Sequence, residues 1–509
     1  MVLLAPPLPQ ASGQTALRPA IPSQTLPSQT LPSQTKPAQT PPTRTQSSPA
    51  LPAQTQPSQT QLSSAQPAQA LLSRTQTTEV EAQRELPQPD LLRQTRRSGF
   101  LLNLGRPLYP VIQSESVDPV RNPYAPGAGQ RPPELAGRDR ELRQFEVVLE
   151  RVARGRPERS MVVTGLRGVG KTVLLNTFKS MAMQRLWGTG KIEARPDKSI
   201  RRPVAAALHL AIRELSPRHR APERIEEFLG VLKAFAMRDP AAVKGTSHWS
   251  AGIDVPASRG RADSGDLEID LTELFVDAAG VATDLGVGIA LFIDEMQDVQ
   301  AADISALCAA CHELSQVGGP LVVVGAGLPH LPGVLSASKS YSERLFRYAR
   351  IDRLDREAAD LALIAPAHEE GVTFTSEALD ALYEAADGYP YFVQAYGKVA
   401  WDLALHSPIT AEDVKISAPE AEEELAVGFF GSRYERATPA ERDYMHAMAS
   451  IGDEPVATSE VADSLGRKPS SLSPARDSLI KKGLIYSAER GLIAFTVPHF
   501  GRFLRAQPV

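Results

Sequence analysis

Glycines, a lysine and a hydroxyl residue follow one another at a fixed spacing between positions 165 and 172. The segment reads GLRGVGKT and fits the pattern G-x-x-x-x-G-K-[ST] without a gap. Gly168 and Gly170 allow the backbone to curl, so that its N–H groups point inward and can donate to phosphate oxygens. We expect Lys171 to reach the β and γ phosphates of a nucleotide, and the Thr172 hydroxyl to bind Mg²⁺. The residues predicted to contact the nucleotide here are Gly165, Leu166, Arg167, Gly168, Val169, Gly170, Lys171, Thr172 and Val173.

Two adjacent acids end an apolar run further along the chain, in the sequence ALFIDE at 290–295. An α/β sheet places its ligands at the carboxyl ends of the strands, which is where these acids would stand. We expect Asp294 to hold Mg²⁺ through water, and Glu295 to orient and polarise an attacking water. The alternative is a solvated pair of acids at a strand end. The glycine-rich loop upstream favours the catalytic interpretation, with ATP and Mg²⁺ as ligands and Glu295 responsible for hydrolysis.

The elements that must position these residues alternate between strand and helix patterns. A β-branched run at 161–164 precedes the loop, and helix-forming residues at 172–184 follow it. The further strands are expected at 191–194, 288–294, 321–325 and 349–354, and the further helices at 142–152, 200–215, 222–237 and 267–285, with a surface loop at 239–265. Strands separated by helices predict an α/β fold with a parallel sheet. The apolar run at 288–294 is typical of a strand that is covered on both faces.

Together these residues resemble the P-loop ATPases of the AAA+ class and the related STAND class. The segment GRDRE at 137–141 resembles the GR-x-x-E element that precedes the loop in origin-recognition-type ATPases and STAND proteins. The resemblance implies that Gly137 and Arg138 lie beside the adenine, although an ordinary charged helix start is the alternative. The segment GYPY at 388–391 resembles the GxP element of STAND proteins, which implies that Pro390 approaches the nucleotide. Such features often mark a switch with slow turnover.

Two further elements of these families are a polar residue that senses the γ-phosphate and an arginine finger. The position that often carries a polar γ-phosphate sensor falls at Gly325-Ala326-Gly327, which offers no polar side chain. The segment YSERLFR at 341–347 contains Arg344 and Arg347. We predict Arg344, rather than Arg347, as an arginine finger that reaches the site of a neighbouring copy in a homo-oligomer. Exposed arginines on a surface helix are the alternative.

Residues 437–509 show three helical patterns, at 438–448, 458–465 and 470–482, followed by two short strand patterns around a turn at 489–491. This order resembles the winged helix-turn-helix that follows the lid in origin-recognition-type ATPases, and its third helix would enter the major groove of duplex DNA. The third helix region is locally basic: Arg467, Lys468, Arg476, Lys481 and Lys482 against Asp477 leave a charge of +4, and Arg490 lies at the turn. DNA contact through 467–490 would therefore be salt-sensitive. A protein-binding winged helix is the alternative.

Composition bears on nucleic-acid binding, disulfides, metal binding and membrane insertion. The net charge of the 509 residues is -4, so the chain as a whole has no basic field that would indicate nucleic-acid binding. The two cysteines, Cys308 and Cys311, exclude a disulfide framework and suit a reducing cytoplasm. They lie in a helical run without a second ligand pair, which favours buried packing over metal binding. No signal peptide is expected, and the longest apolar run, at 285–293, is too short for a membrane helix.

The predicted organisation has six parts. A tail at 1–100 is rich in Pro, Gln, Ser and Thr, repeats SQTLP from residue 23, and is expected to be disordered. The other parts are a linker at 101–133, the ATPase domain at 134–354, a helical lid at 355–410, a helical connector at 411–436 and the winged helix-turn-helix at 437–509.

Three functions are consistent with this organisation. In the first, ATP binding and hydrolysis set the angle of the lid, and the winged helix transmits that state to DNA. In the second, a signalling or assembly ATPase uses the winged helix and the tail to recruit proteins without DNA. In the third, the protein holds ATP without turnover.

Overall fold

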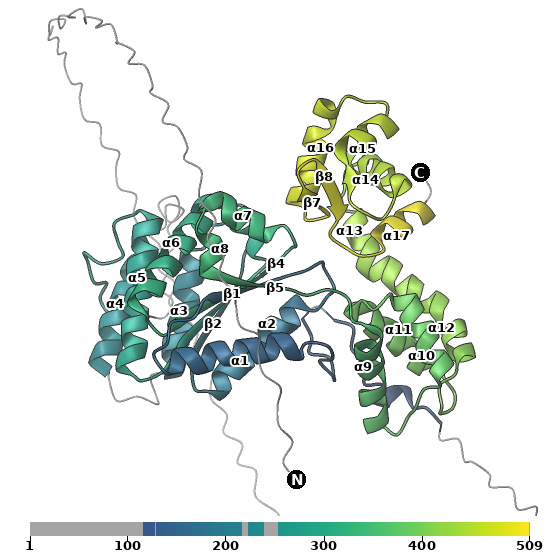
Figure 1. Ribbon diagram of the computed structural model, residues 1–509, viewed down its shortest axis with the longest axis horizontal. Helices are drawn as coiled ribbons and strands as arrows, with labels where there is room; N and C mark the ends of the chain where they lie inside the picture. The colour runs from purple at the N-terminus through teal and green to yellow at the C-terminus, as the bar shows by residue number, and fades with distance from the viewer. Residues whose placement is uncertain (1–115, 128, 216–221, 239–252, 508–509) are drawn as a thin grey trace, which may run out of the picture. The chain divides into compact units, whose positions relative to one another are not determined.

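The computed structural model describes residues 116–127, 129–215, 222–238 and 253–507. The predicted tail at 1–100, about half of the linker at 101–133 and part of the surface loop at 239–265 therefore lie outside the described residues. Figure 1 shows the arrangement of the labelled elements.

Five parallel strands form the central sheet in the order β2-β3-β4-β1-β5. Their bounds are β1 Ser160–Thr164, β2 Gly188–Glu193, β3 Ile289–Asp294, β4 Leu321–Gly327 and β5 Phe346–Arg350. Because all strands run the same way, the carboxyl ends of β1 and β3 reach the same edge of the sheet. This confirms the predicted α/β fold with a parallel P-loop-type sheet.

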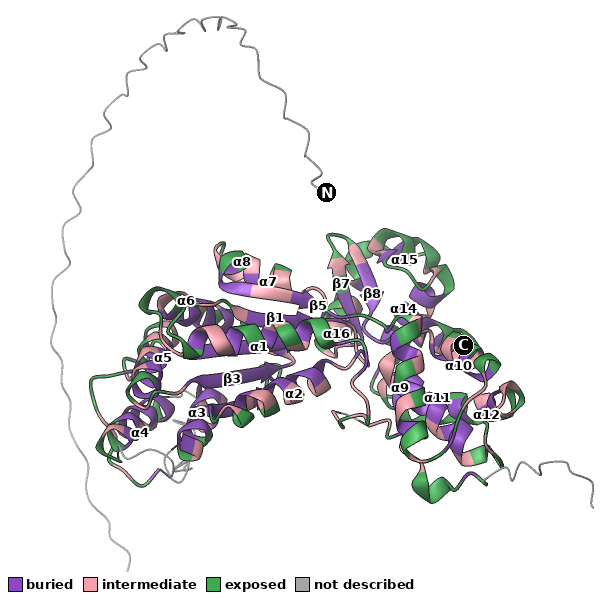
Figure 2. Cartoon of the chain, turned by 60° about the horizontal axis from the view of Figure 1, so that its bottom comes forward, coloured by how far each residue is buried: buried purple, intermediate pink, exposed green. Residues whose placement is uncertain are grey.

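Helices cover both faces of the sheet. On one face, α1 (Asp139–Ala153) and α2 (Lys171–Gln184) pack against the outward side chains of β1, β3 and β4, with Phe145 stacked on Phe178 at 4.5 Å between ring centroids. The other face is covered by α3 (Arg201–Leu215), α4 (Pro222–Met237), α5 (Leu267–Asp284) and α6 (Ala301–Val317). Successive residues of β3 alternate between the two cores, which is why this strand is apolar at every position before Asp294. Figure 2 shows these buried strands between helices with exposed outer faces.

Three strand predictions needed correction in their bounds. The last strand is β5 at Phe346–Arg350, not 349–354, because pairing with β1 starts at Ser160↔Phe346 and Ile351 donates the last ladder bond to Thr164. Strand β2 begins at Gly188, not 191; a Cβ at Gly190 would lie 2.5 Å from the Ala207 carbonyl oxygen of α3, so this glycine permits close helix packing. Strand β4 continues through Gly327.

A helical region follows the sheet, as the sequence predicts. It contains α9 Arg356–Glu369, α10 Ser376–Ala386, α11 Pro390–Leu403, α12 Ala411–Glu424, the π-helix η5 Leu425–Gly431 and α13 Ser432–Tyr434. Ahead of β5, α7 (Leu331–Ser338) and the single-turn helix α8 (Ser342–Leu345) complete the sheet region. The domain boundaries drawn at 354, 410 and 436 stay predictions.

The C-terminal unit contains α14 Pro439–Ile451, β6 Val456–Ala457, α15 Thr458–Ser464, α16 Pro469–Lys481, β7 Ile485–Glu489, β8 Leu492–Phe495 and α17 Phe500–Ala506. The three antiparallel strands pair in the order β6-β8-β7. The three helices and the ribbon were predicted, whereas β6 and α17 were not; the winged helix assignment itself stays a prediction. None of the described helices combines the length and the apolarity that crossing a bilayer requires.

Candidate nucleotide site

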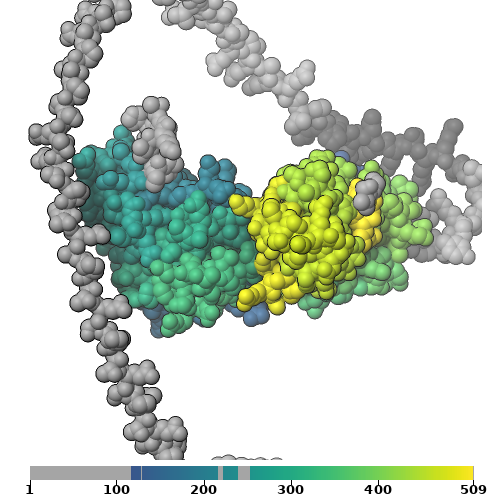
Figure 3. Space-filling view, turned by 90° about the horizontal axis from the view of Figure 1, so that it is seen from above, coloured from purple at the N-terminus to yellow at the C-terminus, as the bar shows by residue number. Residues whose placement is uncertain are grey.

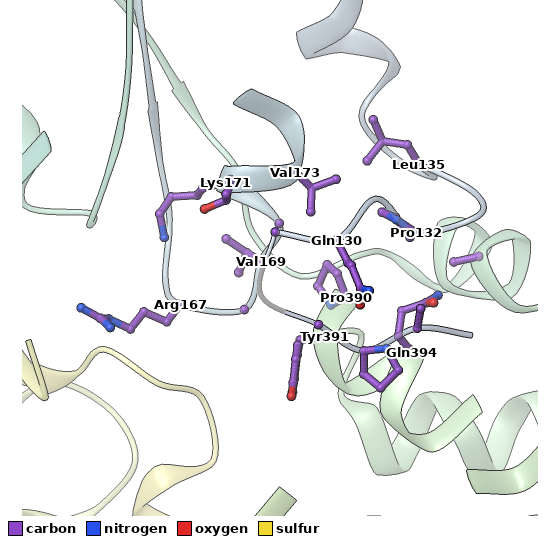
Figure 4. A pocket seen from close by; sticks show the side chains of 18 of the residues that line it. Gln130, Pro132, Leu135, Arg167, Val169, Lys171, Val173, Pro390, Tyr391 and Gln394 are labelled. Carbon is purple, nitrogen blue, oxygen red and sulfur yellow. The ribbon is translucent and has the colours of Figure 1, made fainter. Parts of the chain in front are cut away.

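A cavity of about 530 Å³ lies at the carboxyl edge of the sheet, next to the glycine-rich loop. This volume is in the range of small-molecule sites in proteins. Its walls come from the segment ahead of α1, the loop, the ends of β2 and β3, the start of α11 and the π-helical connector. Figure 4 shows part of this lining. Among the residues predicted for the nucleotide, the cavity is lined by Arg138, Arg167, Gly168, Val169, Gly170, Lys171, Thr172, Val173, Asp294, Glu295 and Pro390.

The loop between β1 and α2 has the backbone that its glycines were expected to permit. Gly168 and Gly170 have φ of 85° and 90°, in the left-handed region that favours glycine, and Gly170 is the N-cap of α2. Gly165 is needed for a different reason, because a Cβ there would lie 2.5 Å from the Ile351 carbonyl oxygen. Residues 167–173 line the cavity, whereas Gly165 and Leu166 do not; the nucleotide contacts of all nine residues stay predictions.

Lys171 is 6% exposed and lies across the loop. Its Nζ donates to the carbonyl oxygens of Gly165 at 2.9 Å and Leu166 at 2.8 Å. Burial lowers the pKa of Lys171 to about 8, although Glu295 opposes this effect. A desolvated ammonium held by neutral carbonyls is well suited to exchange them for phosphate oxygens.

The two acids stand where they were expected, at the end of β3. Asp294 is 4% exposed, and its Oδ2 lies 3.3 Å from Nζ of Lys191. Glu295 follows with a φ of 49°, a left-handed conformation that is strained for a glutamate. Its Oε2 accepts a hydrogen bond of 2.7 Å from Nε2 of Gln297. Both acids therefore have their orientation fixed before a ligand binds.

Residues 325–327 have no polar side chain, but the side chain of Gln297 lies beside this segment. Gln297 Oε1 accepts a hydrogen bond of 3.1 Å from the N–H of Leu328, directly after β4. A Cβ at Gly327 would lie 2.8 Å from that same Oε1. Gln297 thus connects the end of β4 with Glu295, and a glycine at 327 leaves room for it.

A magnesium ion fits the residues at this edge. The Thr172 hydroxyl and the Asp294 carboxylate are oxygen ligands, and both line the cavity. In the described part of the chain, no group of three or more His, Cys, Asp or Glu side chains could hold a metal by itself. That combination suits Mg²⁺, which usually takes one or two protein ligands and completes its shell with water and phosphate oxygens.

Arg138 is held beside the loop by two backbone carbonyls, and its place beside the adenine stays a prediction. Its Nη2 donates to the carbonyl oxygens of Val169 at 3.1 Å and Asp352 at 2.7 Å. The guanidinium therefore ties the loop to the chain beyond β5, and it also lines the cavity. Gly137 does not line it: a Cβ there would meet Ala358 at 2.9 Å.

The start of α11 lies directly against the loop. Pro390 lines the cavity, and its approach to the nucleotide stays a prediction. The N–H of Tyr391 donates to the Gly168 carbonyl oxygen at 3.2 Å. The ring of Tyr391 stacks on Phe429 of the connector, with ring centroids 4.5 Å apart. A Cβ at Gly168 would lie 3.5 Å from Tyr391, so the two aromatic residues cover the loop closely.

Two residues of the site escaped sequence analysis. Arg433, in the connector, lines the cavity, and burial followed by repulsion from Arg167 lowers its pKa to about 10. Gln394 of α11 lines the cavity one helical turn beyond Pro390. Arg433 lies in no motif, so no local signal marked it. Gln394 could have been found from its i+4 spacing to Pro390.

Arg344 lies apart from this cavity. It belongs to α8, directly before the amino end of β5, whereas the loop is at the carboxyl edge of the sheet. Its side chain is exposed, so any contact with a nucleotide would be with that of another copy. Arg347 lies in β5 and pairs with Glu158 at 3.1 Å.

The loop also contacts the C-terminal unit. The N–H of Arg167 donates to the Thr496 carbonyl oxygen at 2.9 Å. A Cβ at Gly483, where φ is 63°, would lie 2.6 Å from Nη2 of Arg167, so the guanidinium rests on this glycine. Figure 3 shows the C-terminal unit in yellow and yellow-green as one rounded surface.

Two of the basic residues expected to contact DNA are engaged within the protein. Lys482 donates to Glu441 at 2.6 Å and to the Arg436 carbonyl oxygen at 2.9 Å. Arg476 pairs with Asp477 at 2.9 Å. The other basic residues of the predicted patch are exposed: Arg467, Lys468, Lys481 and Arg490.

Comparison with known proteins assigns two stretches. Residues 134–324 match the family model described as AAA ATPase domain, and residues 427–504 match a domain of unknown function, DUF8462. No curated protein matches the chain.

Similar solved structures include a Walker-type ATPase of Pyrococcus abyssi, with a TM-score of 0.47, 16% identity, and coverage of 74% of this chain and 97% of that one. The ORC2 protein of Aeropyrum pernix gives a TM-score of 0.41 with 16% identity over 75% and 95%. The RuvB Holliday junction branch migration motor of Thermotoga maritima gives 0.37 with 18% identity over 75% and 100%. Each TM-score is below 0.5, so no function is transferred from these proteins.

Proposed function

We propose, from the premise that residues 134–324 form an AAA ATPase domain, that this protein binds Mg²⁺-ATP in the described cavity and hydrolyses it slowly as a conformational switch. The observation that carries the proposal is the convergence on one cavity of the loop lysine, the two acids and residues from α11 and the connector. A site built from separate segments can change their relative arrangement when a ligand fills it.

Each side chain has a role that its surroundings support. Lys171 exchanges its bonds to the Gly165 and Leu166 carbonyls for bonds to the β and γ phosphates. Thr172 and Asp294 hold Mg²⁺, which neutralises phosphate charge when bound. Glu295 orients and polarises the attacking water. Arg433 adds a second cation, and its lowered pKa is consistent with a guanidinium that lacks a counter-ion until phosphate arrives.

Slow turnover is supported by the state of Glu295. Its carboxylate is engaged by Gln297, which is itself anchored to the Leu328 N–H. A general base must be within hydrogen-bond reach of the proton that it accepts. Gln297 and the attacking water compete for the Glu295 carboxylate. Glu295 can act as the base only if its bond to Gln297 rearranges, or if a second lone pair of the carboxylate points at the water.

A role as a switch is supported by backbone hydrogen bonds between the glycine-rich loop and two other segments. Gly168 accepts from Tyr391 of α11, and Arg167 donates to Thr496 of the C-terminal unit. Phosphate binding to the N–H groups of the same loop alters the backbone that makes both bonds. ATP, ADP and the empty site would therefore favour different arrangements of these two segments.

Coupling to duplex DNA is the preferred output, through the exposed basic residues Arg467, Lys468 and Lys481 near α16 and Arg490 at the β7–β8 turn. These exposed cations support contact with several phosphates of a duplex. The second candidate is a signalling or assembly ATPase whose C-terminal unit binds a protein. It is favoured by the internal pairing of Lys482 and Arg476.

The test is ATP hydrolysis by the wild type and by Glu295→Gln, with and without duplex DNA, over a salt series. The matched control is Glu420→Gln, which changes an exposed glutamate of α12. We expect Glu295→Gln to lose at least ~100-fold in turnover and the control to lose none. DNA should alter the wild-type rate at low salt and lose this effect as salt rises. Equal rates for Glu295→Gln and wild type would refute hydrolysis through Glu295; a DNA effect absent at every salt would favour protein partners.

A further inference from the structure

Gln394 is a buried amide with an unused acceptor. The residue is 7% exposed, yet its Oε1 has no hydrogen-bond partner within the part of the chain that the structure describes. An unsatisfied buried polar atom is costly, and nearly all such atoms in proteins have a partner. The side chain lines the cavity of the nucleotide site. Oε1 is closed off in this side-chain conformation, and rotation of the amide about its last torsion would bring the acceptor to a ligand of that cavity.

The position of Gln394 identifies which part of the ligand it would meet. Figure 4 shows Gln394 on the Pro390 side of the pocket, away from Lys171 and Arg167. The phosphates belong at Lys171 because the loop curls there. The opposite end of the same nucleotide, its base, then falls to the end that contains Gln394.

This end of the cavity is otherwise largely apolar. Pro132, Leu135 and Pro390 lie on the same side of the pocket as Gln394 (Figure 4), and the lining of the whole cavity also includes Ala136, Leu354 and Ala362. Flat apolar walls suit the faces of a purine ring. Other polar side chains of the lining fit the role less well: Gln130 is exposed, and Arg138 is already bonded to two backbone carbonyls.

We propose that Gln394 recognises the base edge of the bound nucleotide, accepting a hydrogen bond from the 6-amino group of adenine and donating to the neighbouring ring nitrogen. A glutamine amide offers one donor group and one acceptor side by side, which complements the donor and acceptor of the adenine edge. The inference rests on the proposed function, since it assigns the base end of the same site. Through this contact the site would bind a 6-aminopurine more tightly than a purine without the amino group.

The experiment is a double-mutant cycle between residue and ligand, with dissociation constants from calorimetry. The ligands are ADP and purine riboside diphosphate, which lacks the 6-amino group; diphosphates keep hydrolysis out of the measurement. The variants are wild type and Gln394→Met, which keeps the length of the side chain and removes the amide. We expect wild type to bind ADP about 10-fold or more tightly than purine riboside diphosphate, and Gln394→Met to bind the two within about 2-fold.

The matched control is Arg433→Gln, which changes the phosphate end. It should weaken both ligands by the same factor and leave the wild-type ratio intact. The same ADP preference in wild type and Gln394→Met would overturn the role of Gln394. Absence of ADP binding by the wild type would instead refute the proposed nucleotide site itself, so the two failures are distinguishable.

A second variant keeps the test decisive if Gln394→Met fails to fold, as thermal unfolding would reveal. Gln394→Glu replaces the amide with a carboxylate, which can only accept. Guanine presents two donors on its edge, so we expect this variant to shift the ADP-to-GDP affinity ratio at least ~10-fold toward GDP. An unchanged ratio in a folded Gln394→Glu protein would also overturn the proposal.

Discussion

The ion pair between Glu441 and Lys482 gives a sharp stability prediction for the C-terminal unit. Glu441, in α14, is 3% exposed and accepts from Nζ of Lys482 at 2.6 Å and from the Thr438 N–H at 2.7 Å. Burial alone would raise the pKa of Glu441, but the hydrogen bonds from Lys482, Ser478 and Thr438 outweigh it and lower that pKa from 4.5 to about 2. The charged form of Glu441 is thus favoured by the fold.

The magnitude follows by linkage. The pKa difference between 4.5 and about 2, at about 1.4 kcal/mol per pKa unit, corresponds to about 3 kcal/mol of unfolding free energy. Because the folded pKa is lowered, this stabilisation is complete above pH 4.5 and is lost as the pH falls toward 2. Glu441→Gln should therefore cost about 3 kcal/mol at pH 7 and far less near pH 2.

The assay is hydrogen exchange of the α14 and α16 amides in the full chain, together with urea unfolding at pH 7 and at acidic pH. Glu435→Gln changes an exposed glutamate nearby and should stay within about 0.5 kcal/mol of wild type. A loss below 1 kcal/mol at pH 7, or an equal loss at both pH values, would refute the assigned role of the pair.

Three further predictions concern the nucleotide site. Arg433→Gln should weaken ATP binding about 10-fold and AMP binding much less in calorimetry, since only ATP has the β and γ phosphates that this cation would contact; equal losses would mean that Arg433 does not contact these phosphates. Gln297→Leu should raise turnover several-fold in a steady-state assay with little change in KM, because it frees Glu295; lower turnover would mean that Gln297 aligns the base instead. If Arg344 acts on a neighbouring copy, mixing Arg344→Ala with Glu295→Gln protein should recover part of the activity that each lacks, whereas an Arg344→Ala protein with wild-type turnover would remove the finger from the mechanism.

Local chemistry explains what the sequence could predict. The strand, loop and helix at 160–184 were found because the motif itself requires left-handed glycines, which Gly168 and Gly170 provide. Asp294 and Glu295 were found because an apolar strand must end at the ligand edge of such a sheet. In both cases the determinants lie within a few residues of one another.

Contacts between distant segments explain what was missed. Arg433 and Gln394 reach the cavity because α11 and the connector pack against the loop. Gln394 has the signal of its i+4 spacing to Pro390, whereas no local signal marks Arg433. The displaced strand β5 has a similar cause: its start is set by pairing with Ser160 of β1, not by the apolar content of 349–354. The place of Arg138 beside the adenine is a prediction from a family resemblance, and its bonds to the Val169 and Asp352 carbonyls depend on segments far apart in the sequence.

The loop bonds suggest why one ligand could control two segments. Phosphate oxygens would be bound by N–H groups of residues 168–172, and the flanking peptide groups already bond outward: Arg167 to Thr496, and Tyr391 to Gly168. Both outward bonds are short connections between backbones, so a peptide rotation that improves phosphate contact weakens them directly. A ligand shifts an equilibrium only by its difference in affinity for the two states. The loop can produce this difference in affinity. The peptide groups that would bind phosphate are next to, or the same as, the peptide groups that bond to α11 and the C-terminal unit.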